Sequence, residues 1–247
     1  MKKGLKWFWR NAHWFFLIAV IAATLCMDVY VAGNLLDSDT ADDVRHGWVI
    51  AQEKNPLSTD IYCSTEVRLL DIATVFSLVF GFTQDWTLVR IIGTIVMQLY
   101  YVCSFLYLCR KAEVSMRPAV FAAGMLLMPF STPYARIVLY HLYYILYLAN
   151  AFWIAGLTLR VMKGGKRTVI PAVLLGGLWI FVGLNGIRHM LIIGIPMLAF
   201  AAVQLLLTLS RYRVEGLRLV GEKPVWQQES VRLMIVLAAS CVCFLIG

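Results

Sequence analysis

The sequence predicts an all-α integral membrane protein with about seven transmembrane helices and one long polar loop after the first of them. The composition is the first reason. Hydrophobic residues make up 61% of the chain and charged residues 15%, whereas soluble domains contain about half and about a quarter. The net charge of +8 would suggest nucleic acid in a soluble protein, but here the positive charge lies mainly in short segments between apolar runs. We therefore expect membrane lipids around the protein and no nucleic-acid partner.

The apolar runs are the second reason, because each reaches or approaches the roughly 20 residues that a spanning helix needs. They cover Trp14 to Leu36, Trp86 to Cys109, Pro118 to Thr132, Ile137 to Met162, Val169 to Ile187, His189 to Leu209 and Val231 to Gly247. The first run is too long for a signal peptide and lacks a cleavage site, so it is interpreted as an anchor. We treat residues 1–247 as a single transmembrane module. The last run ends at Gly247 without a polar flank, which is consistent with a longer native protein.

Charge sets the expected orientation. A cytoplasmic N-terminus places Met1–Arg10, Arg110–Arg117, Arg160–Thr168 and Ser210–Arg232 inside, and these segments hold most of the 22 Lys and Arg residues. This agrees with the positive-inside rule and predicts a protein of the cell (plasma) membrane. The apolar run Leu69–Phe82 is too short to span, so we expect it at the membrane interface. Counting it as a span would turn the later basic loops outward.

The polar segment Leu36–Asp85 is then an outer loop, and its pattern predicts two interfacial helices. Thr40 starts a capping-box-like sequence, and the first helix is expected to run from there to about Lys54. Ser64 or Thr65 is expected to start the second helix. The loop is therefore predicted to be structured.

Two short sequences resemble a known architecture. Leu35–Asp39 forms an acidic step at the outer end of the first span, and Gly183–Arg188 joins two later spans ahead of Pro196. Together with an outer first loop that carries two juxtamembrane helices, they resemble the GT-C superfamily of membrane glycosyltransferases. That superfamily includes protein O-mannosyltransferases, oligosaccharyltransferase catalytic subunits and bacterial aminoarabinose transferases. The resemblance covers most of the chain.

The resemblance implies sugar transfer from a polyprenyl-phosphate donor to an acceptor on the outer face. The acidic residue of the family corresponds to Asp37 or Asp39, as a catalytic base or, if a divalent cation is used, as a metal ligand. The donor phosphate needs a cation. Arg188 is the first candidate, because it lies between two apolar spans on the acidic side, and Arg136 is the second. The structural alternative is that the carboxylates mark a helix end and that the arginines reach toward lipid headgroups.

Other interpretations stay open. A lipid or solute transporter usually shows repeated halves, and no clear internal repeat is found. A non-catalytic multi-span scaffold suits the short chain. Asp28, inside the first span, is either functional or merely close to the outer surface. His141 and His189 are further candidates for the cation at the donor phosphate, and the alternative is that they are interfacial polar residues. The sugar and the acceptor do not follow from the sequence.

Overall fold

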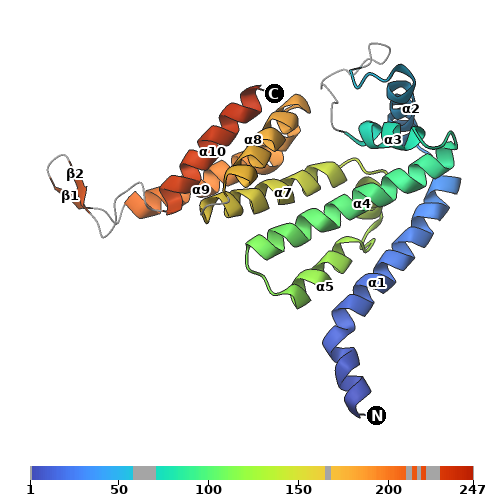
Figure 1. Cartoon of the computed structure of the whole chain (residues 1–247), viewed down its shortest axis with the longest axis horizontal. Coiled ribbons are helices and arrows are strands. Elements are labelled where there is room, and N and C mark those ends of the chain that lie inside the picture. The colour runs from blue at the N-terminus through green and yellow to red at the C-terminus, as the bar shows by residue number, and fades with distance from the viewer. Residues whose placement is uncertain are drawn as a thin grey trace. The chain divides into compact units, whose positions relative to one another are not determined.

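The computed structural model describes residues 2–57, 71–164, 168–209, 213–215, 218–220 and 229–246 (Figure 1). The chain divides into two compact units, with the boundary between Trp153 and Ile154, and each is described by itself. Apart from two short strands, the regular structure of the described residues is helical, which confirms the all-α prediction.

The first unit contains α1 (Lys2–Asn34), α2 (Ser38–Glu53), α3 (Ile72–Phe80), α4 (Trp86–Lys111), α5 (Met116–Leu126), α6 (Thr132–Tyr134), the π-helix η1 (Ala135–Tyr140) and the beginning of α7 (Ile145–Met162). The second unit contains the rest of α7, then α8 (Val169–Leu184), the π-helix η2 (Met190–Gly194), α9 (Ile195–Leu209), β1 (Arg213–Glu215), β2 (Arg218–Val220) and α10 (Glu229–Ile246).

The helices have the length and composition expected of a membrane protein, but the full number of spans is not confirmed. Among the described residues, three are long and apolar enough to cross a membrane: Arg10–Asn34, Trp86–Lys111 and Ile145–Met162. The other predicted runs form shorter apolar helices, Met116–Leu126, Val169–Leu184, Met190–Val203 and Val231–Ile246. The seven-span arrangement therefore stays a prediction.

Two of the predicted runs are interrupted within their expected bounds. The run that begins at Pro118 stops being helical after Leu126, and Pro129 follows closely, where a proline cannot continue the helical hydrogen bonds. The run expected from Ile137 begins as the π-helix η1 and then breaks before α7, where Leu142 has a φ of 64°. Only the second part of that run, from Ile145, is a long α-helix.

The first helix of the polar loop is confirmed, but its predicted start at Thr40 is wrong, and its interfacial position stays a prediction. α2 begins at Ser38 with Asp37 as its N-cap, and the Asp37 carboxylate accepts the backbone N–H of Thr40 at 2.9 Å. An aspartate three residues earlier thus satisfies the donor that sets the helix start. The end agrees with the prediction, since α2 stops at Glu53 and Lys54 adopts a left-handed φ of 54°.

The second short helix, α3, is shorter than a span, as predicted. Its N-cap is Asp71, whose carboxylate accepts the backbone N–H groups of Ala73 and Thr74. The proposed caps Ser64 and Thr65 lie outside the described residues.

Phe76 of α3 joins this loop to α4. Its side chain is 2% exposed and lies against a glycine on either side. A Cβ atom added to Gly47 of α2 would lie 2.6 Å from Phe76 Cβ, and one added to Gly93 of α4 would overlap the Phe76 ring. The two glycines allow α2 and α4 to approach α3 closely, so the polar loop is packed onto a membrane helix.

Arg90 of α4 fixes the C-terminal end of α1. Its Nη1 donates to the carbonyl of Ala32 at 2.7 Å, and its Nη2 donates to the carbonyl of Leu35 at 2.6 Å. The last carbonyls of a helix lack helical partners and carry partial negative charge, which a guanidinium satisfies well. This cap sets the position of Asp37, which follows two residues after Leu35.

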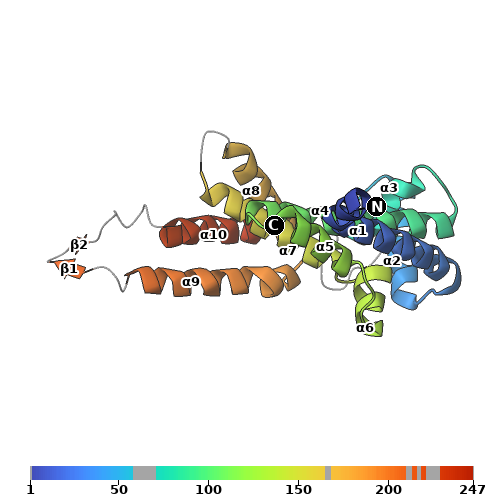
Figure 2. The ribbon, with the colours of Figure 1, turned by 90° about the horizontal axis from the view of Figure 1, so that it is seen from below.

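The second unit is built around α8, α9 and α10. Figure 2 shows α9 and α10 side by side, and Trp179 of α8 packs edge-on against Phe244 of α10 with ring centroids 6.1 Å apart. The strands β1 and β2 pair antiparallel, with Arg213 opposite Val220.

Candidate functional site

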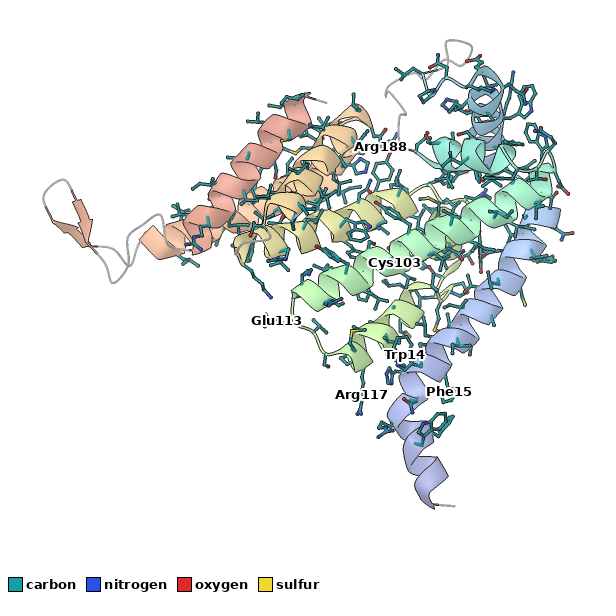
Figure 3. The ribbon with its side chains drawn as sticks, in the orientation of Figure 1. Trp14, Phe15, Cys103, Glu113, Arg117 and Arg188 are labelled. Atoms are coloured by element: carbon teal, nitrogen blue, oxygen red, sulfur yellow. The ribbon has the colours of Figure 1, made fainter. Side chains whose placement is uncertain are left out.

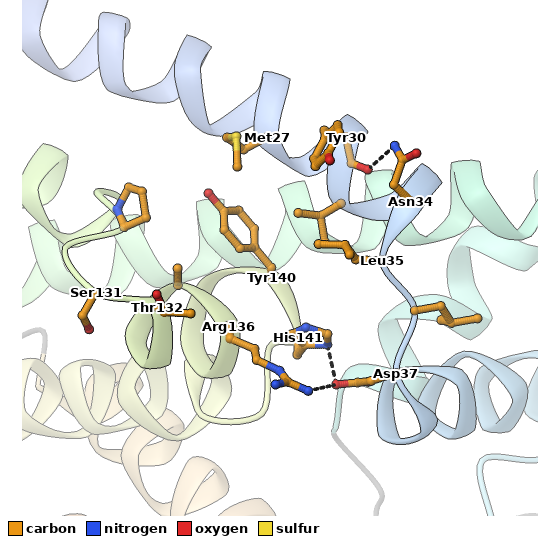
Figure 4. Close-up of a pocket in the computed structure, with 14 residues that line it drawn as sticks. Met27, Tyr30, Asn34, Leu35, Asp37, Ser131, Thr132, Arg136, Tyr140 and His141 are labelled. Atoms are coloured by element: carbon orange, nitrogen blue, oxygen red, sulfur yellow. Dashed lines mark hydrogen bonds and ion pairs between the residues drawn. The ribbon is translucent and has the colours of Figure 1, made fainter.

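A pocket of about 620 Å³ lies in the first unit, between the C-terminal end of α1 and the segment 129–141 (Figure 4). One part of its wall is apolar and the other is polar. It is lined by Met27, Tyr30, Val31, Asn34, Leu35, Leu36, Asp37, Pro129, Ser131, Thr132, Ala135, Arg136, Tyr140 and His141. The pocket therefore combines an apolar surface from a membrane helix with ionisable groups at one end.

The ionisable groups meet at the carboxylate of Asp37. Its Oδ1 caps α2 through the N–H of Thr40. Its Oδ2 accepts a hydrogen bond from the Tyr143 hydroxyl at 2.9 Å and lies 2.9 Å from His141 Nδ1. Arg136 Nη2 lies 3.7 Å from the same oxygen. We call Asp37, Thr40, Arg136, His141 and Tyr143 the Asp37 cluster.

Local backbone structure brings these residues together. Asp37 is held at the first turn of α2, directly after the end of α1 that Arg90 caps. Arg136 belongs to η1, and the N–H of His141 donates to the Arg136 carbonyl at 2.9 Å, a bond across five residues that is typical of a π-helix. Both side chains therefore reach Asp37. π-helical turns are rare and often occur at functional sites.

Electrostatics assign a charge to each member of the pair formed by Asp37 and His141. Burial by itself would raise the pKa of Asp37, but the hydrogen bonds from Thr40 and Tyr143 and the charge that His141 carries at acid pH outweigh it and lower this pKa to about 2. Burial lowers the pKa of His141, and the nearby Asp37 offsets this only in part. At neutral pH the carboxylate is thus ionised and the imidazole neutral.

A neutral His141 can carry its proton on Nδ1, which faces Asp37 Oδ2 and also lies 2.7 Å from Thr40 Oγ1. We infer this tautomer from the neighbouring carboxylate, which can only accept. The other ring nitrogen, Nε2, then carries a lone pair. A carboxylate that orients a histidine in this way also stabilises the imidazolium that forms when Nε2 takes up a proton.

The residues proposed from the sequence fall in different places. Asp37 and Arg136 are brought together in the Asp37 cluster. Asp39 lies in the first turn of α2 with an exposed side chain that accepts from Ser38 Oγ at 3.3 Å, and it does not line the pocket. Arg188 belongs to the second unit, where it is exposed in the connection between α8 and η2 (Figure 3).

The sequence offered His141 and His189 either as further cations for the donor phosphate or as interfacial polar residues. His141 is buried, with 8% of its side chain exposed, and it belongs to the cluster. The signal that identifies it is the spacing of five residues from Arg136, which becomes meaningful only once the segment is known to be π-helical. His189 is also buried and lies in the second unit.

The sequence suggested Asp37 and Asp39 as ligands of a divalent cation. Within the described segments, no group of three or more His, Cys, Asp or Glu side chains lies close enough to hold a metal ion. Both oxygens of Asp37 accept hydrogen bonds from protein groups. The contacts around Asp37 are therefore those of a carboxylate that orients a histidine.

No protein-family model matches the chain, and neither a curated protein nor a solved structure is significantly similar to it.

Proposed function

We propose that this protein is a membrane glycosyltransferase that moves a sugar from a polyprenyl-phosphate donor to a hydroxyl of an acceptor on the outer face. One observation carries the proposal: a single pocket has both an apolar wall from a membrane helix and a cluster of cation, carboxylate and imidazole. A lipid phosphate has the same two parts. Its chain needs an apolar surface and its phosphate needs an arginine.

The proposed topology supports an outer site. The basic N-terminal end of α1 is expected in the cytoplasm, with seven spans in total, so the opposite end of α1 and the pocket beside it would face outward. The helices α2 and α3 would then lie at the outer surface of the plasma membrane. There both a lipid-borne donor and a water-borne acceptor can reach the pocket.

Arg136 is the proposed phosphate ligand. Its side chain is 63% exposed, and its distance of 3.7 Å from Asp37 is longer than a hydrogen bond. An exposed ion pair of this kind is weak, so an incoming phosphate can take over the guanidinium with two parallel hydrogen bonds. Met27, Val31 and Leu36 in the pocket wall would contact the first isoprene units. The role of Arg188 as a second phosphate ligand stays a prediction.

His141 is the proposed base, and Asp37 is the group that holds it. The acceptor oxygen attacks the anomeric carbon and forms the glycosidic bond. The bond from that carbon to the phosphate oxygen breaks, and the lipid phosphate leaves with the electron pair, its charge offset by Arg136. The hydroxyl proton goes to His141 Nε2. With a pKa of about 2, Asp37 is better suited to stabilise the imidazolium than to take the proton itself.

The test is transfer of a labelled sugar from polyprenyl-phosphate donors by the full native protein in reconstituted vesicles. His141→Gln should lower the rate by about 10²- to 10⁴-fold, the usual contribution of a general base. Arg136→Gln should raise the KM for the donor and lower the rate. Arg45→Gln is the matched control, because Arg45 is exposed on α2 and does not line the pocket.

Wild-type transfer that survives both changes would remove this pocket from the mechanism. If folded wild-type protein transfers no sugar from any of several donors, the enzyme assignment fails and the scaffold and transporter interpretations gain.

A further inference from the structure

A second carboxylate, Asp28 of α1, is buried near the pocket and is not used by the proposed mechanism. It is 2% exposed. Its Oδ1 accepts from Gln98 Nε2 at 2.9 Å, and the same amide nitrogen donates to the Leu139 carbonyl at 3.2 Å, which fixes the amide. Asp28 Oδ2 has no hydrogen-bond partner among the described residues. An unsatisfied carboxylate oxygen at this depth is costly, so it requires an explanation.

The explanation lies in a small cavity beside Asp28. It measures about 10 Å³ and is lined by Asp28, Val31, Ala32, Arg90, Thr94 and Tyr140. That volume is about the size of one water probe, and the lining offers the polar partners that a buried water needs. The hydroxyl of Tyr140 is buried and also lacks a partner within the described segments. One water can satisfy both groups, because it can accept from the Tyr140 hydroxyl and donate to Asp28 Oδ2.

Tyr140 connects this cavity to the larger pocket, since it lines both. We propose that the small cavity holds one water molecule and that Asp28 is a proton-binding site which exchanges its proton with the pocket through this water and Tyr140. In one exchange, a hydronium ion in the pocket gives a proton to the Tyr140 oxygen and becomes water, the hydroxyl proton of Tyr140 passes to the water in the small cavity, and a proton of that water passes to Asp28 Oδ2. Tyr140 and the water end unchanged. Asp28 gains the proton that the pocket loses.

The surrounding charges suit a group that can exist in both forms. Arg90 is the charged group that α4 contributes, and its guanidinium donates hydrogen bonds to the carbonyls of Ala32 and Leu35. Gln98 and Thr94, also from α4, are neutral. From η1, Tyr140 faces the cavity. Arg90 lines the same cavity, and its hydrogen bonds to α1 are made whether Asp28 is ionised or protonated. The same guanidinium makes the cavity unsuitable for a metal cation, which it would repel.

The test is infrared spectroscopy of the full protein in lipid nanodiscs, with Asp28→Asn as the assigning variant. The difference between wild type and Asp28→Asn should contain a protonated carboxyl band at low pH that is lost at higher pH. After transfer to heavy water, that band should shift, and the shift should slow in Tyr140→Phe. Tyr30→Phe is the control, since Tyr30 lines the larger pocket but not the small cavity.

A difference spectrum without a protonated carboxyl band at any pH would overturn the proposal. So would a deuterium exchange rate that is the same in wild type and Tyr140→Phe. If Asp28→Asn does not fold, Asp28→Glu makes the assignment instead, because it keeps a carboxyl group at this position and changes the frequency of its band. The experiment needs no sugar donor and is independent of the transfer assay.

Discussion

Asp28 and Asp37 lie on either side of the point where α1 ends, and their surroundings are opposite. Asp37 has hydrogen-bond donors at both carboxylate oxygens, with Arg136 close to one of them. Asp28 is more deeply buried, yet only one of its oxygens has a partner among the described residues. The more exposed carboxylate is thus the better satisfied one.

These contacts determine what each of the two carboxylates can do. A carboxylate with a full set of donors is held in one place and kept ionised, so it can orient a neighbour such as His141. A buried carboxylate with an unsatisfied oxygen gains from binding a proton or a water. Position in the sequence alone favours Asp37 as the reactive group, whereas the contacts favour Asp37 as the holder of His141 and Asp28 as the proton site.

The largest expected effect comes from Arg90, which lies between the two carboxylates. Arg90→Met should lower the free energy of unfolding by about 3 kcal/mol, because it removes two charge-assisted hydrogen bonds to the end of α1. Chemical unfolding in mixed micelles measures this. Arg45→Met, at an exposed position, is the control and should change stability by less than about 0.5 kcal/mol. A loss below about 1 kcal/mol for Arg90→Met would contradict its role as the cap of α1.

A direct comparison of the carboxylates should give a smaller effect. Asp37→Asn should cost about 2 kcal/mol, because the donors from Tyr143 and His141 lose a charged acceptor while asparagine keeps the N-cap. Asp28→Asn should cost less than about 1 kcal/mol, since its amide oxygen still accepts from Gln98 and no charge needs burial. The same unfolding assay applies, with exposed Asp39→Asn as control. A larger loss for Asp28→Asn than for Asp37→Asn would reverse the comparison.

The smallest effect is the pH dependence of that Asp37→Asn difference. The pKa of Asp37 is about 2 in the folded protein against an ordinary 3.8, so the unfolded chain binds the proton first as the pH falls. The stability from ionised Asp37 is therefore fully present above about pH 4 and is lost as the pH falls through about 2. Unfolding of wild type and Asp37→Asn across this window should show their difference shrinking. A difference that stays constant down to about pH 2 would show that the Asp37 cluster does not hold the ionised form.

Composition and the spacing of apolar runs were enough to predict the helical membrane fold, because the demand for internal hydrogen bonding in lipid leaves few alternatives. The short helices α2 and α3 were also predictable, since Asn55 and Pro56 follow the first and the second is too short to span. The start of α2 was missed because several polar residues between 37 and 43 can cap a helix, and only tertiary contacts select Asp37.

The candidate site was predictable only in part. Asp37 could be proposed from the resemblance to the GT-C superfamily, and Arg136 because it is a basic residue at the outer end of an apolar run. The position of His141 beside Asp37 could not be predicted, because it depends on a π-helical turn in a run that looks like an ordinary α-helix. The water cavity beside Asp28 depends on the packing of α1, α4 and η1. No pattern within a single segment encodes such an arrangement.

The position of Phe76 between Gly47 and Gly93 has a consequence for how the pocket can open. Phe76 fills the space beside Gly47 through its Cβ and beside Gly93 through its ring, so α2, α3 and the start of α4 are tightly packed against one another. The side of the pocket that carries Asp37 belongs to this packed group of helices, because Asp37 caps the first turn of α2. The opposite wall, the segment 129–141, contains a short helix and a π-helix, and Leu142, the next residue along the chain, has a left-handed φ. If the pocket opens to admit a lipid, the movement is therefore expected in this second wall, while the wall that carries Asp37 stays in place.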